Sequence, residues 1–173
     1  METQTGHVGT YLGLLQGGEE GLARAFRLVA KQHSGEPDLP RECETFAAWS
    51  DDHVTELRPF LERYGGRPQD PGLLHHLFGD AARGMREGSV MLTLLRQLGH
   101  LWVMAQDNQA SWVVLTQAAQ HLRDESLKLS CREALRRNHV QLAWLKMHLK
   151  ERAPQTLLVP DSTGKTTLFR PRG

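Results

Sequence analysis

One uninterrupted stretch, Met91 to Leu122, constrains the fold of this chain more than any other part of the sequence. Its apolar side chains recur every three or four residues, which is the spacing that buries one face of an α-helix, and no proline interrupts its 32 residues. The pattern breaks at Gln106 to Gln109, where polar side chains fall on the buried face. A polar layer inside a buried helix is either satisfied by the facing helices or forms a site.

Three further segments have helical periodicity, so the sequence predicts a bundle of four helices. The first helix is predicted from His7 to His33 and is followed by Ser34-Gly35, a pair that favours a helix end. The second is predicted from Asp38, a capping carboxylate, to Tyr64. Pro59 lies inside the second helix and is predicted to bend it, because proline has no amide hydrogen to donate.

The third helix is predicted from Arg86 to Arg123, and the fourth from the charged corner at Asp124 to Arg152. Only Asp124 and Ser126 mark the boundary between these two helices. A break near Asp107 is an alternative prediction, because an aspartate at that position could cap a new helix.

The connection between the second and third helices, residues 65 to 85, contains several prolines and glycines. A hairpin between antiparallel neighbours needs about 2 to 8 residues, whereas about 20 residues can run the length of a bundle. We therefore expect a crossover between helices two and three. From Ala153 onward, Pro154, Pro160 and Pro171 predict an extended C-terminal tail. The chain is thus divided into a helical bundle over residues 1–152 and a tail over residues 153–173.

The overall composition excludes several classes of protein. With 39% hydrophobic and 24% charged residues, the 173-residue chain has the balance of one ordinary globular domain. Its formal net charge of +1 gives no bulk attraction to nucleic acid or to an anionic membrane, so neither is expected as a partner. We also expect no membrane span and no export signal, and therefore a cytoplasmic protein in which Cys43 and Cys131 are buried, reduced thiols.

Each predicted helix carries a polar group near its midpoint. These groups are Glu19, His53, Asp107-Asn108 and Asn138-His139, in chain order. Packing four helices of similar length side by side brings the midpoints to one level. At 3.6 residues per turn, Asn108 and Asn138 lie nearer the core centre than Asp107 and His139. Ser50, Asn108 and Asn138 are therefore predicted to form a structural polar layer around His53.

The pattern over residues 8 to 155, with Ala153-Pro154-Gln155 after a tryptophan-containing helix, resembles the ferritin-like superfamily, including its small uncharacterised bacterial members. In metal-binding members, two helices each supply a Glu and two others each supply a Glu-x-x-His pair to a di-iron site. Here Ser50 stands three residues before His53, and Arg136 stands three residues before His139. Because a guanidinium repels cations, the resemblance implies an all-α, ferritin-like four-helix bundle whose di-iron site is degenerate or absent.

On this basis we expect a non-catalytic protein without a cofactor, which forms a homo-oligomer or binds a protein partner. The alternative is a metal-binding oxidoreductase or metal-handling protein with a reduced ligand set. In that case iron, manganese or zinc would be held by Glu19, His53, Asp107 and His139.

Overall fold

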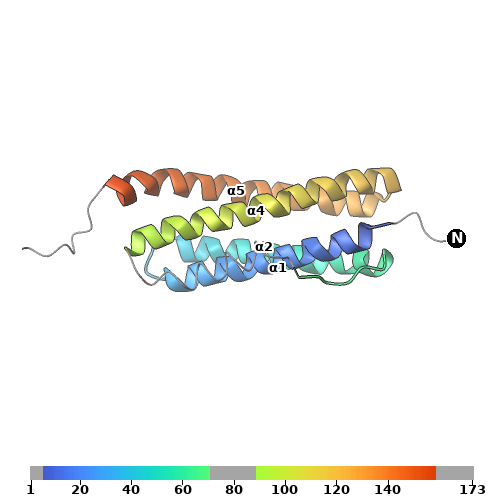
Figure 1. Cartoon of the computed structure of the whole chain (residues 1–173), viewed down its shortest axis with the longest axis horizontal. Coiled ribbons are helices and arrows are strands. Elements are labelled where there is room, and N and C mark those ends of the chain that lie inside the picture. The colour runs from blue at the N-terminus through green and yellow to red at the C-terminus, as the bar shows by residue number, and fades with distance from the viewer. Residues whose placement is uncertain (1–5, 71–88, 159–173) are drawn as a thin grey trace, which may run out of the picture.

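The computed structural model describes residues 6–70 and 89–158, and it shows an all-α four-helix bundle (Figure 1). The helices are α1 (Val8–Gln32), α2 (Leu39–Arg63), α4 (Val90–Leu122) and α5 (Glu125–Leu158). The predicted all-α four-helix fold is confirmed, and α1 and α2 begin and end within one residue of the predicted limits. No helix in the described ranges contains a stretch long and apolar enough to span a membrane.

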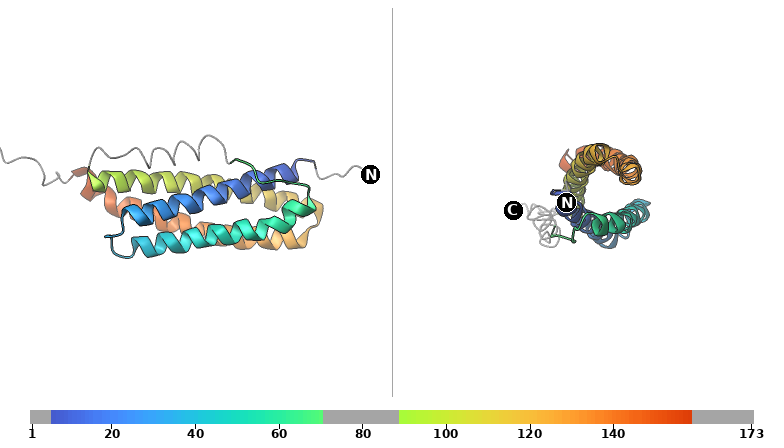
Figure 2. Two further views of the ribbon diagram at one scale, coloured as in Figure 1. Left: turned by 90° about the horizontal axis from the view of Figure 1, so that it is seen from below. Right: turned by 90° about the vertical axis from the view of Figure 1, so that its right-hand side faces the viewer.

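Contacts at the helix ends establish the topology of the bundle. At one end, Arg63 and Tyr64 of the α2 terminus both donate hydrogen bonds to Asp124, which lies between α4 and α5. At the other end, His33 Nε2 after α1 lies 2.7 Å from Gln97 Oε1 near the start of α4. Helices α2 and α4 therefore run in the same direction (Figures 1 and 2). The end of α2 and the start of α4 lie at opposite ends of the bundle, as a crossover requires, although residues 71–85 of the predicted crossover fall outside the described residues.

The first residues after α2 fold back against α1. The amide of Gln69 donates to the carbonyl of Gly13 at 3.2 Å. A Cβ at Gly13 would overlap the carbonyl oxygen of Arg67, and a Cβ at Gly9 would overlap that of Tyr64. Glycine at these two positions therefore allows the returning backbone to approach α1 closely.

Replacing Gly13 with alanine is expected to lower the free energy of unfolding by about 1 to 3 kcal/mol, because either α1 or residues 65–70 must shift to make room. Gly99→Ala in α4 is the matched control, since no described atom lies within 4 Å of an added Cβ there. That control is expected to gain about 0.5 to 1 kcal/mol from removal of a helical glycine. Urea unfolding measures both changes, and equal effects at the two positions would contradict the close approach.

The corner between α4 and α5 is held by the largely enclosed carboxylate of Asp124. This carboxylate accepts hydrogen bonds from Arg63 Nη1 and Tyr64 Oη at 2.7 Å each, from Ser126 Oγ at 2.6 Å and from the Leu127 amide at 3.0 Å. Burial alone would raise the pKa of Asp124, but these hydrogen bonds outweigh burial and hold its pKa well below the ordinary value. Asp124 thus joins the end of α2 to the start of α5.

Asp124→Asn is expected to lower the free energy of unfolding at neutral pH by about 2 kcal/mol. Because the pKa of Asp124 is lowered in the folded protein, its stabilising contribution is complete above the ordinary aspartate pKa of about 3.9 and is lost as the pH falls toward the folded value. Urea unfolding between neutral pH and about pH 3 should therefore show a steeper acid loss in wild type than in the variant. The exposed Glu125→Gln is the control, and parallel pH curves for wild type and Asp124→Asn would contradict this account.

The structure excludes the alternative break in the third helix and corrects the predicted end of the fourth. Helix α4 continues through Asp107, so the alternative break there does not occur; the helix ends at Leu122, where Arg123 adopts a left-handed φ of 55°. Helix α5 continues through Pro154 to Leu158, past the predicted end at Arg152. The carbonyl that Pro154 leaves without an amide donor belongs to the exposed Lys150, where water can satisfy it. The rest of the predicted tail, residues 159–173, lies outside the described residues.

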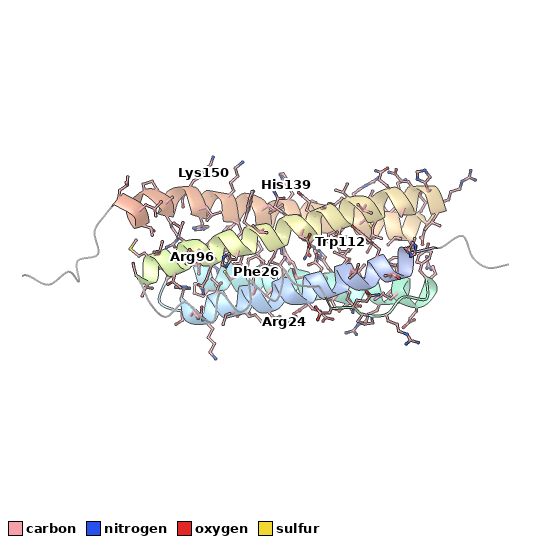
Figure 3. All side chains as sticks on the ribbon, in the orientation of Figure 1. Arg24, Phe26, Arg96, Trp112, His139 and Lys150 are labelled. Carbon is pink, nitrogen blue, oxygen red and sulfur yellow. The ribbon has the colours of Figure 1, made fainter. Side chains whose placement is uncertain are left out.

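The core consists of two hydrophobic clusters that follow one another along the bundle. Figure 3 shows a member of each, Phe26 and Trp112, at different points along the axis. The first cluster contains Leu22, Phe26, Val29, Phe46, Leu98, Leu101 and Leu145 among others. The second contains Leu12, Leu15, Leu57, Trp112, Leu115, Leu127 and Ala134 among others.

Each cluster includes one free, buried cysteine, Cys43 in the first and Cys131 in the second. Burial raises the pKa of Cys43 to about 12 and that of Cys131 to about 11. Both side chains therefore remain protonated thiols at neutral pH, and they pack as small apolar groups.

Candidate functional site

A buried polar layer lies between the two hydrophobic clusters. All four helices contribute to it, and every member is at most 4% exposed: Gln16, Glu19, Ser50, His53, Asn108, Asn138 and Gln141. Since amides, carboxylates and imidazoles are costly to bury without partners, this layer is the part of the core most in need of a physical explanation.

The centre of the layer is a contact between Glu19, His53 and Trp112. The indole Nε1–H of Trp112 donates to Glu19 Oε1 at 2.7 Å, and His53 Nδ1 lies 3.3 Å from the same oxygen. The His53 ring also meets the Trp112 ring edge to face, with centroids 5.5 Å apart. Three helices therefore meet at one carboxylate, and both aromatic rings are fixed against it.

A second set of hydrogen bonds attaches α5 to its neighbours at nearly the same level. Asn138 Nδ2 donates to the carbonyl oxygen of Ala105 in α4 at 3.0 Å, and Gln141 Nε2 donates to that of Phe46 in α2 at 3.3 Å. Each bond adds a second donor to a helical backbone carbonyl, which has two lone pairs. Asn138 and Gln141 are therefore positioned by backbone atoms that do not depend on neighbouring side chains.

Two of the predicted metal ligands lie outside this layer. Asp107 and His139 are both exposed, whereas their neighbours Asn108 and Asn138 are buried. Figure 3 shows His139 on the outer side of α5. One residue step rotates a side chain by about 100° around the helix, which is enough to move it from the core to the surface.

The predicted set of four ligands therefore does not come together; only Glu19 and His53 are in contact. Throughout the described residues, no three His, Cys, Asp or Glu side chains are grouped closely enough to hold a metal ion.

The sequence did not assign Trp112, Gln16 or Gln141 to the site. Trp112 falls on the apolar face of its helix, and a buried indole N–H usually finds a hydrogen-bond partner. Its position four residues after Asn108, and that of Gln141 three residues after Asn138, place both on the faces that carry the polar layer. These spacings are the sequence signal that indicates both residues as members of the layer.

Comparisons with known proteins bear on the fold and leave the chemistry open. No family model matches the chain, and no curated protein matches its sequence. A solved structure, the crystal structure of a protein from Xanthomonas campestris pv. campestris, is similar with a TM-score of 0.74 and 17% sequence identity. The similarity covers 90% of this chain and 97% of that one. It shows the fold alone.

Proposed function

We propose that this chain is a ferritin-like bacterial bundle, located in the cytoplasm, in which a metal-free polar layer replaces the di-iron centre. It acts without catalysis, through self-association or through binding of a protein partner. The observation that carries this proposal is the hydrogen bond from Trp112 to Glu19, because an indole N–H can donate to a carboxylate but cannot bind a metal ion.

The donor set of the layer does not fit a di-iron centre. Such a centre uses several carboxylates together with imidazoles, whereas the layer contains one of each, Glu19 and His53. The other members are amides and a hydroxyl, which are weak ligands for iron.

The outer face of α4 supports the self-association part of the proposal. Val103, Val113 and Val114 are exposed on this helix. Between Arg96 and Arg123, Asp107 is the only Asp, Glu, Lys or Arg in the sequence. An exposed helix face with so few charges and several aliphatic side chains suits contact with another protein surface.

The metal content of the purified protein tests the proposal that the polar layer binds no metal. Protein purified from cultures supplemented with iron, manganese or zinc is expected to contain none of them in stoichiometric amount, and His53→Ala is the matched control. Stoichiometric metal in the wild type that disappears from His53→Ala would overturn the proposal in favour of a metal-handling protein with a reduced ligand set.

Light scattering tests the proposal that the chain self-associates through the outer face of α4. The full chain is expected to have a mass above that of one protomer, and Val103→Glu/Val114→Glu is expected to return it to a monomer. These valines are eleven residues apart and so share one face of α4. Val140→Glu, at an exposed valine of α5, is the control and should keep the wild-type mass. A monomeric wild type would contradict self-association through this face.

A further inference from the structure

Several buried polar atoms of the layer have no hydrogen-bond partner within the described parts of the chain. They are Glu19 Oε2, Ser50 Oγ, both ring nitrogens of His53, Asn108 Nδ2 and Asn138 Oδ1, together with Gln16 Oε1. His53 Nδ1 lies 3.3 Å from Glu19 Oε1, but this contact is not a hydrogen bond. Leaving one such group unpaired costs the protein the hydration that the group had in the unfolded chain, and native cores contain few of them. So many in one layer indicate that something else satisfies them.

Four of these side chains belong to helix turns that touch one another. Glu19 and His53 are in contact, and Ser50 lies one turn before His53 on α2. Asn108 lies one turn before Trp112, whose indole bonds Glu19. The unpaired atoms thus belong to one short section of the bundle.

Asn138 completes this section from the fourth helix. It donates to the carbonyl of Ala105, which lies one turn before Asn108 on α4. Its unpaired Oδ1 therefore belongs to the same level as Asn108.

The unpaired atoms include both hydrogen-bond donors and acceptors. Glu19 Oε2 and Asn138 Oδ1 accept, Asn108 Nδ2 donates, and Ser50 Oγ can do either. A metal ion could be bound only by the acceptor atoms and would leave the donors unpaired. Water both donates and accepts, and a buried water molecule typically makes about three hydrogen bonds to otherwise unpaired groups.

We infer that the polar layer encloses ordered water molecules that bridge Glu19, Ser50, His53, Asn108 and Asn138 across the four helices. The enclosed water satisfies the groups that direct contacts leave unpaired, and it separates the two hydrophobic clusters. This inference goes beyond the proposed function because it assigns the layer a ligand. A dry layer would overturn it and leave the metal-free proposal standing.

A crystal structure of the full chain, at a resolution that shows ordered water, tests the inference directly. The expected result is solvent density within about 2.7 to 3.2 Å of Asn108 Nδ2, Asn138 Oδ1 and Glu19 Oε2, without anomalous scattering from a metal. Direct pairing of these side chains with one another, with no solvent between them, would overturn it. A metal ion or an organic molecule in the layer would overturn it as well.

Solution NMR provides an independent measurement on the same full-length protein. Magnetisation transfer from water to the ring protons of His53 and Trp112 is expected in the wild type and in Ser111→Ala, a control on α4 outside the layer. The transfer should be lost in Asn108→Leu/Asn138→Leu, which removes two of the water-binding amides. Absence of transfer in the wild type, or its persistence in the double variant, would count against enclosed water.

Discussion

Replacing His53 with leucine is expected to lower the free energy of unfolding by about 1 to 3 kcal/mol, the cost of leaving a buried polar group short of a partner. His53 and Glu19 are each 1% exposed, and their contact at 3.3 Å is the closest approach of an imidazole to this carboxylate. Without His53, the Glu19 carboxylate would keep only the indole of Trp112 as a described partner. Urea unfolding followed by circular dichroism measures the loss.

Two further variants separate the cost of the unpaired carboxylate from the loss of packing. Glu19→Gln/His53→Leu removes the carboxylate but keeps an oxygen that accepts from Trp112, so it should be more stable than His53→Leu alone. His139→Leu changes an exposed histidine and should alter stability by no more than about 0.5 kcal/mol. If the double variant were no more stable than His53→Leu, the unpaired carboxylate would not be the cause.

Trp112→Ala is expected to cost about 3 to 5 kcal/mol, because it empties the space of the largest fully buried side chain in the core. Trp112→Phe keeps most of that volume and removes the N–H, so it should cost about 1 to 3 kcal/mol. Circular dichroism is the appropriate probe, since the substitution removes a fluorophore.

A double-mutant cycle between Trp112→Phe and Glu19→Leu shows whether the hydrogen bond is responsible. Once Glu19 is leucine, the indole has lost its acceptor, and the further change to phenylalanine should cost much less than it does in the wild type. Additive effects would mean that Trp112 stabilises the bundle by packing alone.

The sequence was sufficient to predict the four helices because apolar periodicity is a local property. Boundary signals were less reliable. The sequence makes Asp107 a potential helix cap, but its side chain lies on the exposed face of a continuous helix. Pro154 predicts the end of a helix, yet the carbonyl that it leaves without a donor is on the solvent side of α5. In both cases, whether the helix continues depends on whether the residue or the affected carbonyl faces solvent or the core.

The site was predicted only in part, for a similar reason. Glu19 and His53 were identified from their midpoint positions, and the structure brings them into contact. Asp107 and His139 were included because they are adjacent to inward positions, although one residue step turns them outward. The contact between Trp112 and Glu19 joins residues 93 positions apart, so it depends on how the helices are aligned along the bundle. Periodicity within one helix carries no information about that alignment.

The polar layer is divided between the two helical hairpins and controls how they align along the bundle axis. Hairpin α1–α2 carries Glu19 and His53, while hairpin α4–α5 carries Trp112 and Gln141. Two of the described bonds cross between the hairpins, from Trp112 to Glu19 and from Gln141 to the carbonyl of Phe46. Hydrophobic side chains alone would tolerate a slip of one helical turn, about 5.4 Å, between the hairpins. Such a slip would place a carboxylate and an amide against hydrocarbon. The layer therefore favours one alignment of the two apolar hairpin faces over the others.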